Sequence, residues 1–199
     1  GKKYVQFCRE RNIGGAILQG IRTDDPYLQE LVEANIPCVL IDAALETEQE
    51  FIGSVSTDNI AAFREMATYL LENNHRDIVV VAGKHEAYVD LWRLRGVREA
   101  FEDFGLTLTE DRIIYGHYTE QGAFEAAKRY LQERHPTAFL CFSDLMALGV
   151  MKAVEENGLV IPDDISLTGN DGLIITEYTQ PPLTTIWQNF FEIGRQAAN

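Results

Sequence analysis

Short apolar runs alternate with amphipathic segments along almost the whole chain. Runs of about four or five apolar residues that end at a polar residue or glycine are typical of buried parallel strands, whereas apolar residues three or four positions apart indicate a helix with one buried side. These patterns predict strands at residues 16–18, 38–41, 52–56, 78–82, 113–115, 138–142 and 165–168. They predict helices at residues 25–34, 58–73, 92–104, 121–133 and 145–157.

The order of these segments predicts the fold class. Strands that alternate with helices of about 10–15 residues form βαβ units, which build a mainly parallel sheet. We therefore expect an α/β protein. The sequence contains no internal repeat, low-complexity tract or long Pro/Gly/Ser linker. A boundary between two lobes should therefore lie in short crossing segments, for which residues 54–57 and 181–187 are the candidates.

Polar residues gather where two of the predicted strands end. Ser143 and Asp144 follow one apolar run, and Asn170 and Asp171 follow the next. In open α/β sheets, ligands bind in the crevice outside the carboxyl ends of the strands. The sequence therefore predicts a functional rim formed by these side chains.

Composition narrows the classes of function. The formal net charge is -14, from 31 acidic and 17 basic residues, so this segment lacks the basic footprint that DNA binding needs. No apolar run approaches the ~18–20 residues of a transmembrane helix, and no secretory signal is visible at the start. Cys8, Cys38 and Cys141 lack motif spacing, which favours a reducing cytoplasm over a disulfide framework.

Enzymatic motifs are absent from the sequence. There is no Gly-x-Ser-x-Gly elbow, P-loop or dinucleotide-binding glycine motif. The four histidines are scattered, without His-x-x-x-His or Cys-x-x-Cys spacing for a metal. We therefore expect no catalytic residue, no metal site and no cofactor.

Several short blocks occur in a fixed order along the chain: STDN at residues 56–59, HRDI at 75–78, RLRG at 93–96, DLMALG at 144–149, PDDIS at 162–166, GND at 169–171 and PPLTTI at 181–186. Each block is weakly specific alone, but the ordered set covers essentially the whole chain. In their order and spacing, the blocks resemble the ligand-binding core of the lactose/galactose-repressor (LacI/GalR) family.

The resemblance implies a two-lobed core of the type I periplasmic-binding-protein kind. It divides the chain into a partial N-lobe (residues 1–56), a C-lobe (57–187) and a return segment into the N-lobe (188–199). The family's helix-turn-helix and hinge have no counterpart in this sequence, nor do the first strand, helix and second strand of the N-lobe. We therefore expect the N-lobe of this chain to be incomplete.

The resemblance also implies effector-binding residues in the C-lobe. Arg93 matches an arginine that reaches into the cleft from a helix start, where its rigid fork can donate to two hydroxyls or a carboxylate. The alternative is a surface arginine beside Arg95 and Arg98. Asp171 matches an acceptor for ligand hydroxyl or N–H groups, with a self-capping turn aspartate as the alternative.

Four further positions complete this expected set. Tyr118 resembles the family's aromatic platform, or else packs in the core. Ser143 stands where the family often has asparagine, so its shorter hydroxyl would contact the ligand through water. Asp42 and Gln19 follow two N-lobe strands and match the N-lobe side of the cleft.

The function implied by the resemblance is that of a cytoplasmic transcriptional repressor. The chain would be its effector-binding and dimerisation core, and would bind a sugar or related metabolite between the lobes. Operator DNA would be contacted only through a helix-turn-helix absent from this segment. We expect the intact core to be a homodimer, and outward residues around Phe7, at 90–92 and at 145–150 to meet a partner or the other lobe. The alternative is an extracytoplasmic sugar-binding protein of a transporter, which has the same core but does not regulate transcription.

Overall fold

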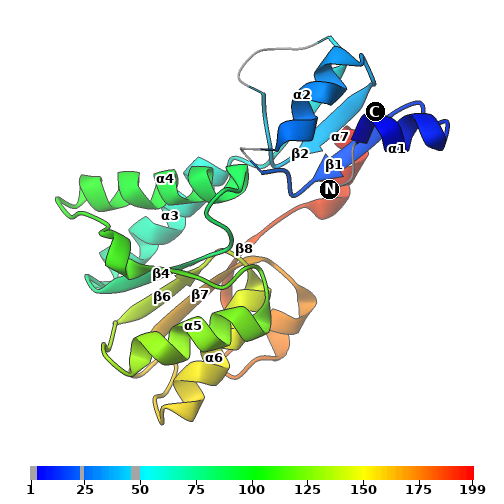
Figure 1. The fold of residues 1–199 in the computed structure, drawn as a ribbon. Helices are drawn as coiled ribbons and strands as arrows, with labels where there is room; N and C mark the ends of the chain where they lie inside the picture. The colour runs from blue at the N-terminus through cyan, green and yellow to red at the C-terminus, as the bar shows by residue number, and fades with distance from the viewer. Residues whose placement is uncertain (1–3, 23–24, 46–49) are drawn as a thin grey trace. The chain divides into compact units, whose positions relative to one another are not determined.

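The computed structural model describes residues 4–22, 25–45 and 50–199, and the chain divides into two compact units (Figure 1). Unit 1 comprises residues 1–57, 86–89 and 189–199, and unit 2 comprises 58–85 and 90–188. The boundaries expected from the sequence did not include the short excursion of residues 86–89 into unit 1.

Unit 1 contains a small parallel sheet with the order β1-β2-β3. Helix α2 begins where the sequence favours it, because Asp25 caps it by accepting the Tyr27 N–H at 2.9 Å and Pro26 occupies its first turn. A compact apolar cluster closes this unit, formed by Ile21, Leu28, Leu40 and Ala43. The described elements are α1 (Tyr4–Glu10), β1 (Ala16–Gln19), α2 (Pro26–Glu33), β2 (Cys38–Ile41), β3 (Ile52–Val55) and α7 (Phe190–Ala198).

Unit 2 is a five-stranded parallel sheet with the order β5-β4-β6-β7-β8. Figure 1 shows α3 and α4 on one face of this sheet and α5 and α6 on the other, so its central strands are buried on both sides. The elements are α3 (Asn59–Glu72), β4 (Ile78–Ala82), α4 (Tyr88–Asp103), η1 (Glu110–Arg112), β5 (Ile113–Tyr115), α5 (Glu120–Leu131), β6 (Ala138–Cys141), α6 (Asp144–Glu156), β7 (Ser166–Asp171), η2 (Ile174–Tyr178) and β8 (Thr184–Trp187).

The strand order of unit 2 contains a topological switch point. From β4 the chain passes through α4 to β5 on one side, and then through α5 to β6 on the other side of β4. The connections after β4 and β6 therefore diverge, which opens a crevice outside the carboxyl ends of these two strands. This is the edge of the sheet at which a ligand site is expected.

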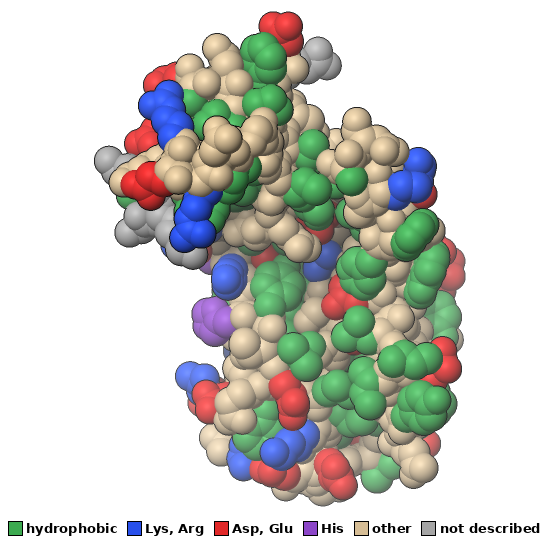
Figure 2. All heavy atoms as spheres, turned by 90° about the vertical axis from the view of Figure 1, so that its right-hand side faces the viewer, with side chains coloured by type: hydrophobic (Ala, Val, Ile, Leu, Met, Phe, Trp, Pro, Cys, Tyr) green, Lys and Arg blue, Asp and Glu red, His purple; other side chains and the backbone are tan. Residues whose placement is uncertain are grey.

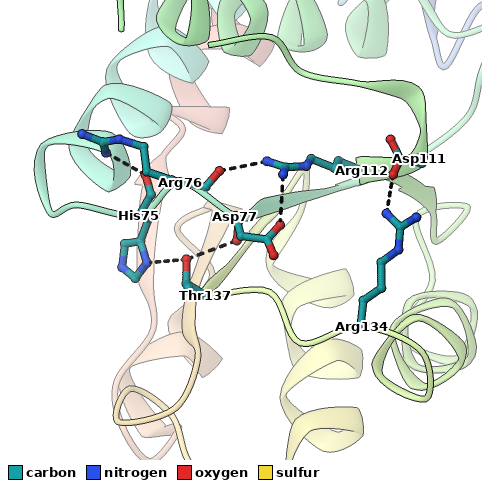
Figure 3. A network of polar contacts seen from close by, with 7 residues as sticks. All are labelled: His75, Arg76, Asp77, Asp111, Arg112, Arg134 and Thr137. Carbon is teal, nitrogen blue, oxygen red and sulfur yellow. Dashed lines mark hydrogen bonds and ion pairs between the residues drawn. The ribbon is translucent and has the colours of Figure 1, made fainter. Parts of the chain in front are cut away.

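The opposite, amino edge of the same sheet is held by polar contacts (Figure 3). Arg112, just before β5, donates to the Arg76 carbonyl at 2.8 Å and lies 3.6 Å from the Asp77 carboxylate. Thr137, just before β6, donates to the Asp77 carbonyl at 3.2 Å and contacts His75 Nδ1 at 3.0 Å. These contacts join the segments that lead into β4, β5 and β6. Since they are largely exposed, we expect them to add little to stability.

The prediction of an α/β fold with parallel sheets is confirmed, since every strand pair in the described residues is parallel. Two boundaries of the predicted elements differ by three or more residues from those of the structure. Strand β7 continues to Asp171, because Gly169 and Asn170 pair with Thr185 and Ile186 of β8. The apolar pattern did not predict this part of the strand, since Gly169 and Asn170 are not apolar strand formers. Helix α4 begins four residues before the predicted position, since its first turn has no apolar stripe.

Candidate ligand-binding site

Arg93 lies at the switch point of unit 2 and is buried, with 4% of its surface exposed. Its Nε donates to Asn59 Oδ1 at 2.9 Å, and its Nη1 donates to the Phe142 carbonyl oxygen at 2.6 Å. The guanidinium carbon lies 5.2 Å from the Phe63 ring centroid and 6.0 Å from that of Phe142, within cation–π range. Of the five N–H donors of the side chain, these bonds use two.

The other arginines of α4 have a different setting. Arg95 bonds to Glu99 at 2.8 Å and Arg98 bonds to Glu110 at 2.8 Å, and both are surface ion pairs. Arg93 is therefore not one of these surface arginines. Its inward position follows from the 3.6-residue period, which places it one turn before Val97, a residue of the core.

The Phe142 carbonyl oxygen links Arg93 to Asp171. Asn170 Nδ2 donates to this oxygen at 3.3 Å and to Asp171 Oδ1 at 2.8 Å. Asp171 Oδ1 also accepts a bond from Gln188 Nε2 at 3.1 Å. The backbone φ of Asp171 is 131°, a strained value for a residue with a side chain. These bonds hold the carboxylate in a fixed, partly exposed position at the end of β7.

A second group of side chains fixes the loop after β4. Asp90, at the start of α4, accepts the Gly83 N–H at 2.7 Å, the Lys84 N–H at 3.2 Å and the Tyr118 hydroxyl at 2.9 Å. Burial raises the pKa of Asp90 above its ordinary value, while these three bonds and the charge of Arg93 act in the opposite direction. The Asp90 carboxylate is therefore buried, and it holds the backbone of the loop after β4 through these hydrogen bonds.

Tyr118 packs against the backbone of the same loop. A Cβ on Gly83 would lie 1.9 Å from a ring carbon of Tyr118, so only glycine permits this approach. Burial is the main cause of the raised pKa of Tyr118, and the charge and hydrogen bond of Asp90 add to it. The phenol is thus a neutral donor with a partly exposed ring.

Ser143 and Asp144 lie directly after β6 and have structural partners. Ser143 Oγ caps α6 by accepting the Met146 N–H at 3.2 Å, which leaves its hydroxyl proton for donation. Asp144 is fully buried, and it accepts the Leu173 N–H at 2.8 Å and the Thr185 hydroxyl at 2.5 Å. Asp144 therefore connects the start of α6 to two other segments, the loop after β7 and strand β8.

The two remaining expected residues belong to unit 1. Asp42 follows β2 with a φ of 55°, and its Oδ1 accepts the Ser56 hydroxyl at 2.8 Å. Gln19 is the exposed last residue of β1. Both lie at the carboxyl edge of the sheet of unit 1. Arg93, Tyr118, Ser143 and Asp171 lie at the carboxyl edge of the sheet of unit 2. The rim predicted from the sequence named Ser143 and Asp171 at this edge, together with Asp144 and Asn170.

Three residues of the rim of unit 2 were missed in the sequence. Asn59 and Asp90 orient Arg93 and Tyr118, and Gln188 holds Asp171. Gln188 is 5% exposed, and among the described residues its Oε1 is a buried acceptor without a partner. One signal was present for Asp90, which lies on the same helical face as Arg93, three positions earlier.

Chemically, the rim of unit 2 presents a guanidinium, a carboxylate, a neutral phenol and a hydroxyl. This combination suits a ligand rich in hydroxyl or N–H groups. Within the described part of the chain, no group of three or more His, Cys, Asp or Glu side chains is placed to hold a metal ion.

Two α/β units, each with polar side chains at the carboxyl edge of a parallel sheet, and a chain that crosses between them several times, define a protein of the periplasmic-binding-protein class. Residues 67–199 match the family described as a periplasmic binding protein-like domain. A crystal structure of a putative transcriptional regulator LacI from Bacillus cereus subsp. cytotoxis is 32% identical, with a TM-score of 0.91, over 98% of this chain and 69% of that one. The chain belongs to the LacI family of transcriptional regulators.

Two further relatives are similar over nearly all of this chain. The HTH-type transcriptional repressor PurR of Vibrio campbellii is 34% identical over 98% of this chain and 59% of its own length. The structure of a complex between the transcriptional regulator CelR and cellobiose is 29% identical, with a TM-score of 0.88, over 97% of this chain and 59% of that one. The chain thus spans less than two thirds of the length of the curated relatives that it matches. These relatives are regulators rather than enzymes, as the sequence predicts.

Proposed function

We propose that this chain is the effector-binding core of a transcriptional repressor. The observation that carries the proposal is the set of hydrogen bonds from Arg93 through the Phe142 carbonyl and Asn170 to Asp171, at the topological switch point of unit 2. The network orients a donor and an acceptor before any ligand arrives, which lowers the entropic cost of binding. Asp42 and Gln19 are proposed as further ligand contacts from unit 1.

The proposed effector is a sugar or a related metabolite. Vicinal hydroxyls suit both the fork of Arg93 and the carboxylate of Asp171, and the ring of Tyr118 offers an apolar surface for a sugar face. The related regulator CelR forms a complex with cellobiose, which supports a carbohydrate as the ligand of this chain. Ser143 supplies a hydroxyl that donates directly or through water.

The proposed mechanism is a linkage between effector binding and DNA binding. The effector favours one relative orientation of the two units, and this orientation sets the spacing of two DNA-binding heads in a homodimer. The DNA-binding heads are proposed by analogy with the relative PurR, which is an HTH-type transcriptional repressor. A coupling free energy of about 1–3 kcal/mol suffices for a useful switch.

The relatives do not favour the alternative, an extracytoplasmic binding protein of a transporter. PurR is a repressor, and the structures from Bacillus cereus and of CelR are those of regulators. We therefore place the proposed repressor in the cytoplasm, where its operator lies. In the part of the chain that the structure describes, no helix is both long and apolar enough to span a membrane.

A thermal-shift screen tests the proposed function. The protein is heated with a panel of mono- and disaccharides, sugar phosphates, nucleosides and nucleobases, with cellobiose included. A ligand at about 100 times its Kd adds about 2.7 kcal/mol to the free energy of unfolding, which raises the Tm by several degrees. We expect at least one sugar or nucleoside to give a saturable shift. A panel in which no compound shifts the Tm would contradict the proposal.

An exposed apolar surface of unit 2 supports the proposed homodimer. Ile174 and Tyr178 in η2 are 68% and 75% exposed, and Leu145 and Ile175 are also exposed. Figure 2 shows hydrophobic side chains gathered on the face of unit 2 that carries η2. Patches of this kind on soluble proteins usually mark interfaces.

The prediction that residues 90–92 and 145–150 face outward was partly wrong. Asp90 is buried, as are most residues of 145–150, because they face the loop after β4 and the core. Phe7, Leu91 and Leu145 are exposed as expected.

We expect the double variant Ile174→Asp/Tyr178→Asp to shift the protein from dimer to monomer in light scattering at micromolar concentration. Two carboxylates in an apolar interface would be desolvated without partners. The control is Phe104→Ser, a similar loss of an exposed aromatic side chain, just beyond the end of α4. The control should remain dimeric. A wild-type protein that is monomeric, or a double variant that still dimerises, would contradict this interface.

A further inference from the structure

Residues 116–119, which lead from β5 into α5, form a tight turn with an unusual backbone. The Thr119 N–H donates to the Gly116 carbonyl oxygen at 3.0 Å and closes the turn. The two central residues, His117 and Tyr118, have φ values of 56° and 57°. Turns with two consecutive positive φ values are normally built from Asn and Gly, because a larger side chain crowds the backbone there. A histidine followed by a tyrosine therefore places strain in this turn.

Contacts with the loop after β4 and with the start of α4 hold the turn in this conformation. The His117 N–H donates to the Gly83 carbonyl oxygen at 3.0 Å. The Tyr118 ring packs on Gly83, and the Tyr118 hydroxyl donates to Asp90 Oδ2 at 2.9 Å. A strained backbone persists only where the surrounding structure fixes it, and such positions cluster at ligand sites. The strain at the carboxyl edge of unit 2 therefore supports a role of this turn in binding.

Asp90 joins the turn to the loop through one buried carboxylate. Its side chain is 1% exposed, so an effector on the rim does not contact it. Its Oδ1 accepts the Gly83 N–H at 2.7 Å, and its Oδ2 accepts both the Lys84 N–H at 3.2 Å and the Tyr118 hydroxyl. An asparagine in its place would turn an NH₂ group toward one of these donors in either orientation. Only a carboxylate therefore satisfies all three donors.

The bond to Asp90 also decides which part of Tyr118 an effector meets. A phenol has one O–H donor, and Asp90 already accepts it. The hydroxyl proton is therefore committed within the protein. The ring is partly exposed, and it offers an apolar face.

We infer that Asp90 is a positioning residue of the effector site, which fixes the Tyr118 ring as a preformed apolar face without contacting the effector itself. The inference rests on the proposed function, because Tyr118 is a proposed effector contact. It adds that Tyr118 recognises the effector by its ring and not by its hydroxyl proton, which suits a ligand with an apolar face, such as a sugar ring or a base. A ring that is fixed before the effector arrives lowers the entropic cost of binding.

Asp90→Asn tests the positioning role by NMR without any effector. We expect the backbone signals of residues 117–119 to shift, because the turn loses its anchor. The Tyr118 hydroxyl proton, which should exchange slowly in the wild type, should exchange too fast to be observed in the variant. The control is Asp103→Asn, which removes an exposed acid paired with Arg64 from the end of the same helix. An Asp90→Asn protein that keeps the hydroxyl signal and the turn signals of the wild type would overturn the inference.

Tyr118→Phe is the reciprocal experiment, and it decides the question if Asp90→Asn does not fold. Phenylalanine keeps the ring and removes only the hydroxyl. We expect the amide signals of Gly83 and Lys84 to shift, because these amides share the Asp90 carboxylate with the hydroxyl. Tyr69→Phe, at an exposed tyrosine of α3, is the control and should leave these signals unchanged. Unchanged Gly83 and Lys84 signals in Tyr118→Phe would overturn the inference.

A double-mutant cycle tests whether Asp90 acts on binding through Tyr118. The probes are cellobiose and every other compound of the thermal-shift panel that raises the Tm of the wild type. We expect Asp90→Asn to weaken binding about 10-fold and Tyr118→Phe about threefold, and the double variant to bind within about twofold of Asp90→Asn. Factors that multiply in the double variant would show independent action and overturn the inference. A panel without any binder would instead contradict the proposed function, and the NMR results alone would then decide the positioning role.

Discussion

Replacing Arg93 by Lys should weaken binding of the effector found by the screen by about 10- to 100-fold, although the positive charge is kept. An ammonium is a point charge. It cannot contact Asn59 Oδ1 and the Phe142 carbonyl together while directing a donor at a ligand, as the guanidinium does. The Tm should also fall by several degrees, because the buried Phe142 and Asn59 oxygens lose a charged donor. Calorimetric titration and thermal melting measure the two effects.

Arg95→Lys is the control for this experiment. Arg95 lies two positions further along α4, where it forms an exposed ion pair with Glu99. Such pairs contribute about 0–1 kcal/mol, so this variant should bind and melt like the wild type. If Arg93→Lys binds the effector as tightly as Arg95→Lys does, the assignment of Arg93 is wrong.

The second large effect is expected for Gly96→Ala, at the contact of α4 with α3. A Cβ at this position would lie 2.2 Å from the Ile60 carbonyl oxygen and 2.9 Å from the Arg64 nitrogen. Both are backbone atoms, so α4 must move away from α3. We expect a loss of about 1–3 kcal/mol in the free energy of unfolding, although alanine favours a helix by about 1 kcal/mol. The effector affinity should fall as well, because the same movement separates Arg93 from Asn59.

Gly194→Ala provides a control with the opposite sign. Gly194 also lies inside a helix, α7, but a Cβ there would have no atom within 4 Å. Alanine should therefore stabilise the protein by about 0.5–1 kcal/mol. Chemical denaturation followed by circular dichroism compares the two variants. A Gly96→Ala protein as stable as Gly194→Ala would show that α3 and α4 do not pack this closely.

Apolar pattern alone was sufficient to locate β4, β5 and β6 of unit 2, whereas β8 was predicted only as part of a crossing segment. Strand β4 reads Ile-Val-Val-Val-Ala and is buried at every position, so its burial and its place in the middle of a parallel sheet follow directly. The rim was also predictable, because Ser143 and Asp171 end or follow such strands. The last residues of β7 were not, since Gly169 and Asn170 are poor strand formers that tertiary pairing with β8 holds in place.

The supporting residues of the site could not be read from the sequence. Asn59 looks like the first residue after the cap Asp58, and Gln188 looks like a polar residue after a strand. Only the packing of α3 against α4 and the pairing of β7 with β8 bring them to Arg93 and Asp171.

Hydrogen–deuterium exchange with the effector identified by the screen tests the central claim most directly. The account predicts slower exchange in the loop after β4, including the Gly83 and Lys84 amides held by Asp90, and in the segments around Ser143 and Asp171. Arg93→Lys should reduce this protection at equal effector concentration. An effector that protects only other segments would contradict the assignment of the rim as the effector site.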